Sequence, residues 1–189
     1  MAAAFSAARK RFGNIEILVN CAGMAPPAPF HRVDFADWQR TMDVNVNGVF
    51  HCSQIALETM LDKGWGRIIN IGSVASLRGF PYVSGYCASK HAVLGITRAL
   101  ALEVATQGIT VNAICPGYVD TDIVREAISG IVTKTGRTEG EAMQHFTESN
   151  PQGRLVDASE VASAVSWLCS DGAGSVTGQA VAIDGGGTA

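Results

Sequence analysis

RIINIGS, residues 67–73, sets the architecture of this chain. Arg67 to Ile71 have the length and composition of a strand buried in a sheet, and Gly72 and Ser73 end it with a small polar turn. Open α/β sheets bind their ligands at the carboxyl ends of such strands. The stretch therefore predicts a buried strand and, at Ser73, the position of a site.

Helices and strands alternate on either side of this strand. Upstream, the apolar run Ile15 to Asn20 predicts a central strand buried on both faces. Asp34 is expected to cap a long helix whose apolar stripe contains an amide, Asn45. Downstream, a helix from about Gly85 to Gln107 precedes a strand from Ile109 to Ile114.

The rest of the chain completes an α/β pattern. Residues 118–153 lose regular periodicity and are expected to form a long substrate-binding loop with one amphipathic stretch, Ile123 to Val132. Asp157 to Glu160 has the form of a capping box, and Gln179 to Ile183 is expected to be the last strand. We therefore expect residues 1–189 to form a single domain with a doubly wound parallel sheet.

The first twelve residues allow two interpretations. They are rich in alanine and basic, as in a short transit peptide. However, Phe5, Ala8 and Phe12 share one helical face, and Gly13 can end a helix. We expect the last turns of a domain helix.

Composition excludes several classes of protein. With 47% hydrophobic and 16% charged residues, the chain is expected to be compact and globular. A net charge of -3 without a long basic run argues against a nucleic-acid partner, and no apolar run reaches the roughly 20 residues of a membrane span. Five scattered cysteines favour reduced thiols in a cytoplasmic protein, and four histidines without ligand spacing predict no metal site.

Tyr86 and Lys90 form the first candidate for catalysis. They stand four residues apart near the start of a predicted helix, so both side chains project from one face. A neighbouring ammonium lowers the pKa of a tyrosine, ordinarily near ~10, and makes it a usable acid/base. The alternative is a surface lysine lying along a partly buried tyrosine. Ser73, thirteen residues before Tyr86 at a strand end, favours the catalytic interpretation.

The motifs together resemble the classical short-chain dehydrogenase/reductase pattern. The matching segments are NCAG at 20–23, DVNV at 43–46, Ser73, YCASK at 86–90 and PGYVDT at 116–121. The resemblance runs over residues 1–189 with every motif in order. It implies a Rossmann-like fold and an NAD(P)-dependent oxidoreductase that interconverts a carbonyl and a secondary alcohol.

The resemblance implies roles for four catalytic residues. Tyr86 would exchange a proton with the substrate oxygen, and Ser73 would orient that oxygen. Lys90 would lower the pKa of the tyrosine and hold the nicotinamide ribose. Asn45 would hold a water molecule that links Lys90 to solvent, although a buried structural asparagine is the alternative.

The resemblance also implies cofactor contacts from two further motifs. Small residues after the first strand would line the adenosine side, and the segment after Pro116 would hold the nicotinamide carboxamide. The alternative for Pro116-Gly117 is a turn that ends a strand, and Cys87 and Cys115 are expected to be packing residues. The implied cofactor set is Asn20, Ala22, Gly23, Tyr86, Lys90, Pro116, Gly117, Val119 and Thr121.

One expected motif is not found in the sequence. A dinucleotide fold carries a glycine-rich phosphate loop before a helix and a cofactor selector about 20 residues later. Gly185 to Gly187 cannot substitute, because no helix is expected after them. We therefore expect an N-terminally truncated member with weak cofactor binding and an open apolar edge at Ile15 to Asn20, and the choice between NAD and NADP stays open.

The substrate is the least defined part of this interpretation. Arginines that dock acyl carrier protein in related reductases correspond here to Gly64 and Gln107, so we expect a small or coenzyme A-linked 3-oxoacyl, 3-hydroxyacyl or alcohol substrate. The resemblance implies a homo-oligomer, typically a tetramer. The alternative to an active oxidoreductase is an inactive truncated fragment that keeps only the assembly surfaces. Four cations could contact a phosphate-bearing tail or simply face solvent. They are Arg125, Lys134, Arg137 and Arg154.

Overall fold

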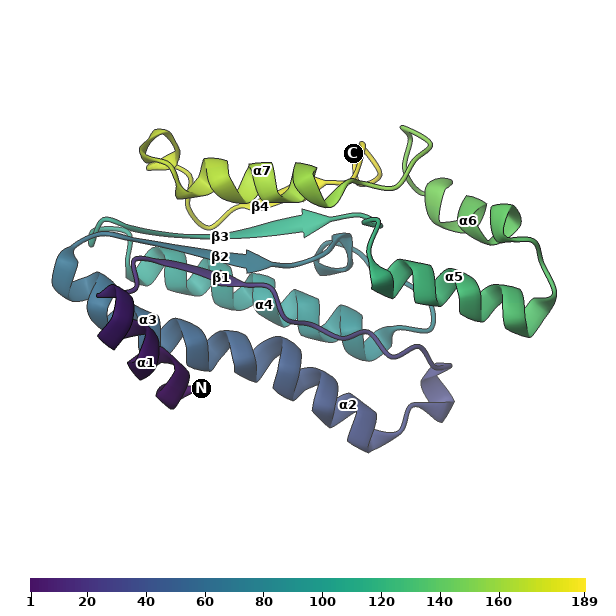
Figure 1. The fold of residues 1–189 in the computed structure, drawn as a ribbon, viewed down its shortest axis with the longest axis horizontal. Helices are drawn as coiled ribbons and strands as arrows, with labels where there is room; N and C mark the ends of the chain where they lie inside the picture. Colours follow the sequence, from purple (N-terminus) through teal and green to yellow (C-terminus); the bar gives the residue numbers. More distant parts are fainter.

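A single parallel sheet organises the molecule (Figure 1). The computed structural model describes residues 1–189, except for the side chain of Ile123, the first residue of the predicted amphipathic stretch. The strands are β1 (Ile17–Asn20), β2 (Gly66–Ile71), β3 (Ile109–Pro116) and β4 (Ala180–Ile183). They lie in the order β1-β2-β3-β4 and every pairing is parallel. The predicted parallel α/β sheet is confirmed.

Seven α-helices of the described chain connect and cover the strands. They are α1 (Ala2–Phe12), α2 (Phe35–Met42), α3 (Gly48–Lys63), α4 (Ser84–Glu103), α5 (Asp122–Thr135), α6 (Glu139–Thr147) and α7 (Ala158–Cys169). Short 3-10 helices lie at η1 (Phe30–Arg32), η3 (Val74–Ser76) and η4 (Asp171–Ala173), and a π-helical turn, η2 (Asp43–Asn47), joins α2 to α3. Over the described residues, no helix has both the length and the hydropathy of a membrane span.

Two hydrophobic layers bury the centre of the sheet. Ile68 of β2 packs in a cluster with Met60 of α3, whereas its neighbour Ile69 packs with Leu168 of α7. Because successive strand residues point to opposite faces, β2 is buried between the two layers. Figure 1 shows α7 on one side of the sheet and α3 and α4 on the other. This is the doubly wound arrangement that the sequence predicts.

The N-terminal segment corrects two expectations. The predicted helix is present as α1, and Gly13, with φ 86°, follows it, but Phe12 is 77% exposed and only Phe5 of the proposed face packs against the core. The strand β1 lies at the edge of the sheet, which confirms the expected open apolar edge, and it is not buried on both faces as its apolar run alone predicts. Ile17 and Val19 are 45% and 40% exposed, because no helix covers that side of β1 in the described chain.

Residues 118–153 contain two helices where one amphipathic stretch was expected. The missed helix is α6, which begins with a capping box between Thr138 and Glu141. Val124 and Ile128 of α5 pack against Phe146 of α6, so the pair has its own small core. Figure 1 shows α5 and α6 beyond the carboxyl ends of the strands, where the predicted substrate-binding loop would have to lie.

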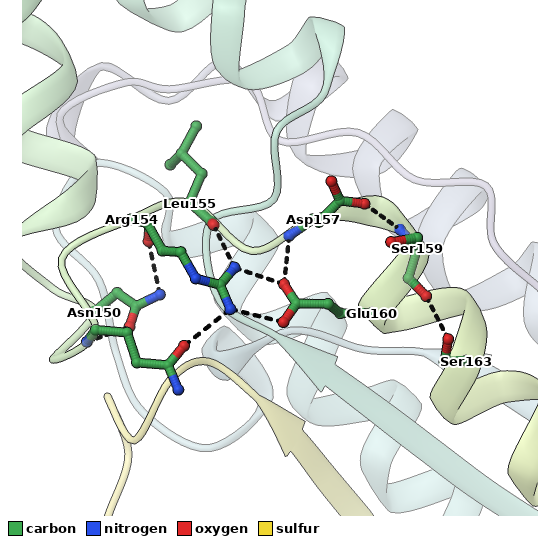
Figure 2. Close-up of polar contacts among 8 residues, drawn as sticks. Asn150, Arg154, Leu155, Asp157, Ser159, Glu160 and Ser163 are labelled. Atoms are coloured by element: carbon green, nitrogen blue, oxygen red, sulfur yellow. Dashed lines mark hydrogen bonds and ion pairs between the residues drawn. The ribbon is translucent and has the colours of Figure 1, made fainter.

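A network of polar contacts connects the segment after α6 to the start of α7 (Figure 2). Arg154 donates to both carboxylate oxygens of Glu160 at 2.7 Å, and one of those oxygens also accepts from the Asp157 backbone N–H at 2.8 Å. The side chain of Asn150 donates to the Arg154 carbonyl at 2.7 Å. We call Arg154 and Glu160, with these backbone contacts, the clasp. The predicted capping box at Asp157 is confirmed as part of it.

The C-terminal glycines have a packing role. A Cβ on Gly185 would lie 1.8 Å from the side-chain oxygen of Asn150, and one on Gly187 would lie 2.7 Å from the Ser149 carbonyl. Only residues without a side chain allow the last segment to run this close to the clasp.

Candidate active site

Ser73 stands at the carboxyl end of β2, as the sequence predicts. Its hydroxyl oxygen accepts from the Ala75 N–H at 3.1 Å, and its own N–H donates to Ser76 Oγ at 3.2 Å, so a capping box fixes the turn. The preceding residue must be small: a Cβ on Gly72 would lie 2.9 Å from Ser76 Oγ. Because Ser73 Oγ accepts from the backbone, its O–H is free to donate to another group.

Tyr86 lies in the first turn of α4, and its hydroxyl is close enough to the Ser73 side chain for Ser73 to affect its pKa. Burial raises the pKa of Tyr86 above its ordinary value, and the hydrogen bond with Ser73 lowers it by less. The Lys90 ammonium lies 5.5 Å from the centre of the tyrosine ring. The expectation that Lys90 brings the pKa of Tyr86 below its usual range is therefore wrong for this structure, because desolvation dominates.

Lys90 is 4% exposed and points back toward β2. Its ammonium donates to the Ile71 carbonyl at 2.7 Å, and burial lowers its pKa to about 8. A Cβ on Gly23 would lie 3.6 Å from Lys90 Nζ and 3.5 Å from Asn45 Oδ1. The structure thus brings the segment after β1 next to two of the predicted catalytic residues.

Asn45 occupies the π-helical turn η2, a geometry that often marks functional sites. It is 1% exposed, and its amide nitrogen donates to Ser89 Oγ and to the Met24 carbonyl, both at 2.9 Å. Its amide oxygen accepts from the Met24 N–H at 2.9 Å. The amide therefore ties the segment after β1 to α4, which matches the structural alternative. The water relay stays a prediction.

Asn20 directs its side chain into the sheet. Its amide nitrogen donates to Asn70 Oδ1 at 2.8 Å and to Ser53 Oγ at 3.3 Å. Asn70 in turn donates to Thr97 Oγ1 at 2.9 Å. Its side-chain nitrogen is therefore occupied within the sheet, whereas Ala22 and Gly23 are exposed after the end of β1, and the cofactor contacts of all three remain predictions.

The segment Pro116–Thr121 connects β3 to α5. Gly117 donates to the Ile183 carbonyl at 3.0 Å, and a Cβ there would lie 3.2 Å from Asp184 Cβ, so this turn packs closely against Asp184. Val119 forms a bridge with Val156, and Thr121 Oγ1 donates to the Val119 carbonyl at 3.3 Å. The turn alternative for Pro116-Gly117 is thus compatible with the structure, and the nicotinamide contacts of Val119 and Thr121 remain predictions.

Sequence reasoning missed Tyr118 as part of the site. Its ring meets Phe146 edge-on, with centroids 4.9 Å apart, and burial raises the pKa of Tyr118. It is close enough to Tyr86 to raise the pKa of that residue further. The available signal was its position between Gly117 and Val119. Cys87 and Cys115 are buried beside Tyr86, as expected for packing residues, and burial raises the pKa of the Cys115 thiol.

Comparison with known proteins identifies the family. The family described as Enoyl-(Acyl carrier protein) reductase matches residues 1–188. D-beta-hydroxybutyrate dehydrogenase of Rhizobium meliloti (strain 1021) is 40% identical over 180 residues, which are 95% of this chain and 70% of that protein. The chain belongs to the short-chain dehydrogenase/reductase family. This is a family of oxidoreductases.

Solved structures of short-chain dehydrogenases/reductases have the same fold. A variant of actinorhodin polyketide ketoreductase with NADPH superposes with a TM-score of 0.94 at 37% identity, over 99% of this chain and 73% of that one. ElxO with NADP bound gives 0.87 at 30% identity, over 97% and 71%. The Rossmann-like interpretation is confirmed, and both proteins are longer than this chain.

Proposed function

We propose that this chain is an NAD(P)-dependent oxidoreductase that interconverts a carbonyl and a secondary alcohol with Tyr86 as acid/base. The observation that carries the proposal is the meeting of Tyr86 and Ser73 at the carboxyl end of β2, with Lys90 tethered to the same strand end. Polar groups at this position act on ligands in open α/β sheets.

The residues present fit a nicotinamide cofactor at this strand end. Lys90 uses one N–H for the Ile71 carbonyl, so two further donors are available for ribose hydroxyls. Gly23 keeps the space beside Lys90 free of a side chain. The backbone after β1 would hold the adenosine side of the cofactor, and the Val119–Thr121 segment would hold the nicotinamide. A bound nicotinamide supplies or accepts the hydride.

The chain's own residues would handle the proton. With its pKa raised by burial, Tyr86 is a neutral phenol at neutral pH and can donate its proton to a carbonyl oxygen. Ser73 donates its O–H to the same oxygen and so fixes its position. In the reverse direction, the phenolate would accept the alcohol proton, which requires higher pH.

The test is removal of one oxygen atom, Tyr86→Phe. We expect the turnover number to fall by at least ~10²-fold, because general acid catalysis is lost while the ring still packs. The assay follows the absorbance of reduced nicotinamide with a short 3-oxo acid and its ester, using NADH and NADPH separately.

Tyr82→Phe is the matched control. Tyr82 lies four residues earlier and is 66% exposed, so its hydroxyl should not affect turnover. A Tyr86→Phe variant that folds normally by circular dichroism and keeps wild-type turnover would refute the acid/base role.

A further inference from the structure

Arg78 lies on the segment between η3 and α4, five residues after Ser73. Its N–H donates to the Val74 carbonyl at 3.1 Å, so the η3 turn sets its position. Its guanidinium carbon lies 4.9 Å from the centre of the Phe80 ring. This cation–π contact holds the charged group against the loop beside the site.

Arg78 and the residue it stacks on, Phe80, lie near two neighbours of Tyr86. Cys87, the residue after Tyr86, has its sulfur 3.9 Å from the Phe80 carbonyl. The charge of Arg78 lowers the pKa of Tyr118, although burial raises that pKa by more. Tyr118 and Cys87 in turn act on Tyr86. The guanidinium therefore lies near side chains that act on the reacting tyrosine.

The charge of Arg78 is not neutralised by a carboxylate. It takes part in none of the ion pairs within 4 Å among the side chains that the structure describes. Two cations that the sequence offered for substrate binding are used elsewhere: Arg125 pairs with Asp120 at 3.0 Å, and Arg154 pairs with Glu160. Arg78 is thus an exposed cation beside the site that can still bind an anion.

We propose that Arg78 binds an anionic oxygen group of the substrate while Ser73 and Tyr86 act on its carbonyl. The planar guanidinium matches a carboxylate or a phosphate through paired N–H donors. The substrate class is therefore an anionic carbonyl compound, either a short 3-oxo acid or an acyl thioester with a phosphate-bearing tail. This inference rests on the proposed function.

Two matched substrate pairs distinguish the source of the anion. Acetoacetate is compared with its methyl ester, and acetoacetyl-CoA with the neutral N-acetylcysteamine thioester. In each pair, kcat/KM for the anionic substrate is divided by kcat/KM for the neutral one. For Arg78→Gln we expect this ratio to fall about tenfold in one pair, as for a lost hydrogen bond to a charged group. The pair that changes identifies a carboxylate or a phosphate.

Two further variants separate charge from structure. Arg78→Lys keeps the charge but loses the paired N–H donors, so it should retain only part of the discrimination. Arg11→Gln removes an arginine stacked in the same way, 5.0 Å from the Phe12 ring, at the end of α1 that leads to the opposite end of β1. It should keep the wild-type ratio in both pairs.

Calorimetric titration with acetoacetate and with coenzyme A makes the result independent of turnover. Binding that Arg78→Gln weakens would support the inference even if no substrate were reduced, in which case only the proposed function fails. Unchanged ratios in both pairs, or a wild-type protein that binds neither anion, would overturn it.

Discussion

At the scale of a single residue, burial of the charged Lys90 side chain destabilises the folded protein. Its ammonium is almost fully buried with a carbonyl rather than a carboxylate as its partner. Burial lowers its pKa from 10.5 to about 8, which corresponds to roughly 3 kcal/mol against the charged, folded form. A site that must present a cation to a ligand is expected to carry such a cost.

The cost predicts a pH dependence of stability. The folded-state pKa of Lys90 lies below the unfolded one, so the unfolded chain binds more protons between about pH 8 and about pH 10.5. In that window the contribution of Lys90 to the free energy of unfolding rises with pH. Urea unfolding at several pH values gives the free energy of unfolding of wild type and of Lys90→Met. Between about pH 8 and about pH 10.5, the difference between the two should shift in favour of wild type by roughly 2–3 kcal/mol.

Lys10→Met controls for the loss of one exposed lysine, since Lys10 lies at the surface of α1. If the wild-type and Lys90→Met curves stay parallel across the window, the ammonium is not desolvated as the structure indicates.

At the scale of secondary-structure elements, the clasp ties the segment after α6 to the first turn of α7. Hydrogen bonding to Arg154 lowers the pKa of Glu160 to about 2. The depressed pKa means that the contribution of Glu160 is present above its unfolded pKa and is lost as the pH falls toward about 2. Both side chains are partly exposed, so the pair acts locally rather than on global stability.

Glu160→Gln tests the clasp. It removes the charge but leaves an oxygen for the Asp157 N–H, so the cap should weaken without being lost. Hydrogen exchange at the Asp157 amide should become roughly three- to tenfold faster near neutral pH. Glu58→Gln, which removes the 3.6 Å pair with Arg9, serves as the matched surface control. Unchanged exchange at Asp157 would show that Arg154 does not hold the cap.

At the scale of the whole molecule, β1 leaves one edge of the sheet open. Its free edge is apolar, with Ile17 and Val19 exposed, and such edges pair with other chains. We expect this chain to self-associate with rising concentration and Val19→Lys to reduce the association several-fold, because a charge on an edge strand opposes pairing. Light scattering over a concentration series measures both.

Val44→Lys is the control for added charge, because Val44 is 38% exposed on η2 and is not part of the sheet. A monodisperse wild-type monomer at high concentration would contradict the prediction.

Patterns in the sequence were enough to predict the order of the strands, and the resemblance of the motifs to a known family implied its chemistry. Periodicity located the strands Gly66–Ile71 and Ile109–Pro116 to within two residues, because buried parallel strands are apolar throughout. Spacing placed Tyr86 and Lys90 on one helical face, and turn residues placed Ser73 at a strand end. These properties depend on neighbours in the chain, so a linear pattern can reveal them.

Contacts between segments distant in sequence set the properties that no such pattern revealed. The pKa of Tyr86 is set mainly by burial, with Cys87 of α4 and Cys115 of β3 raising it further, which reverses the direction that its spacing from Lys90 predicted. The bonds of Asn45 to Met24 and Ser89, and the availability of Arg78 where Arg154 is paired, likewise arise from packing between separate segments. Desolvation and ion pairing depend on three-dimensional surroundings, which spacing along the chain does not contain.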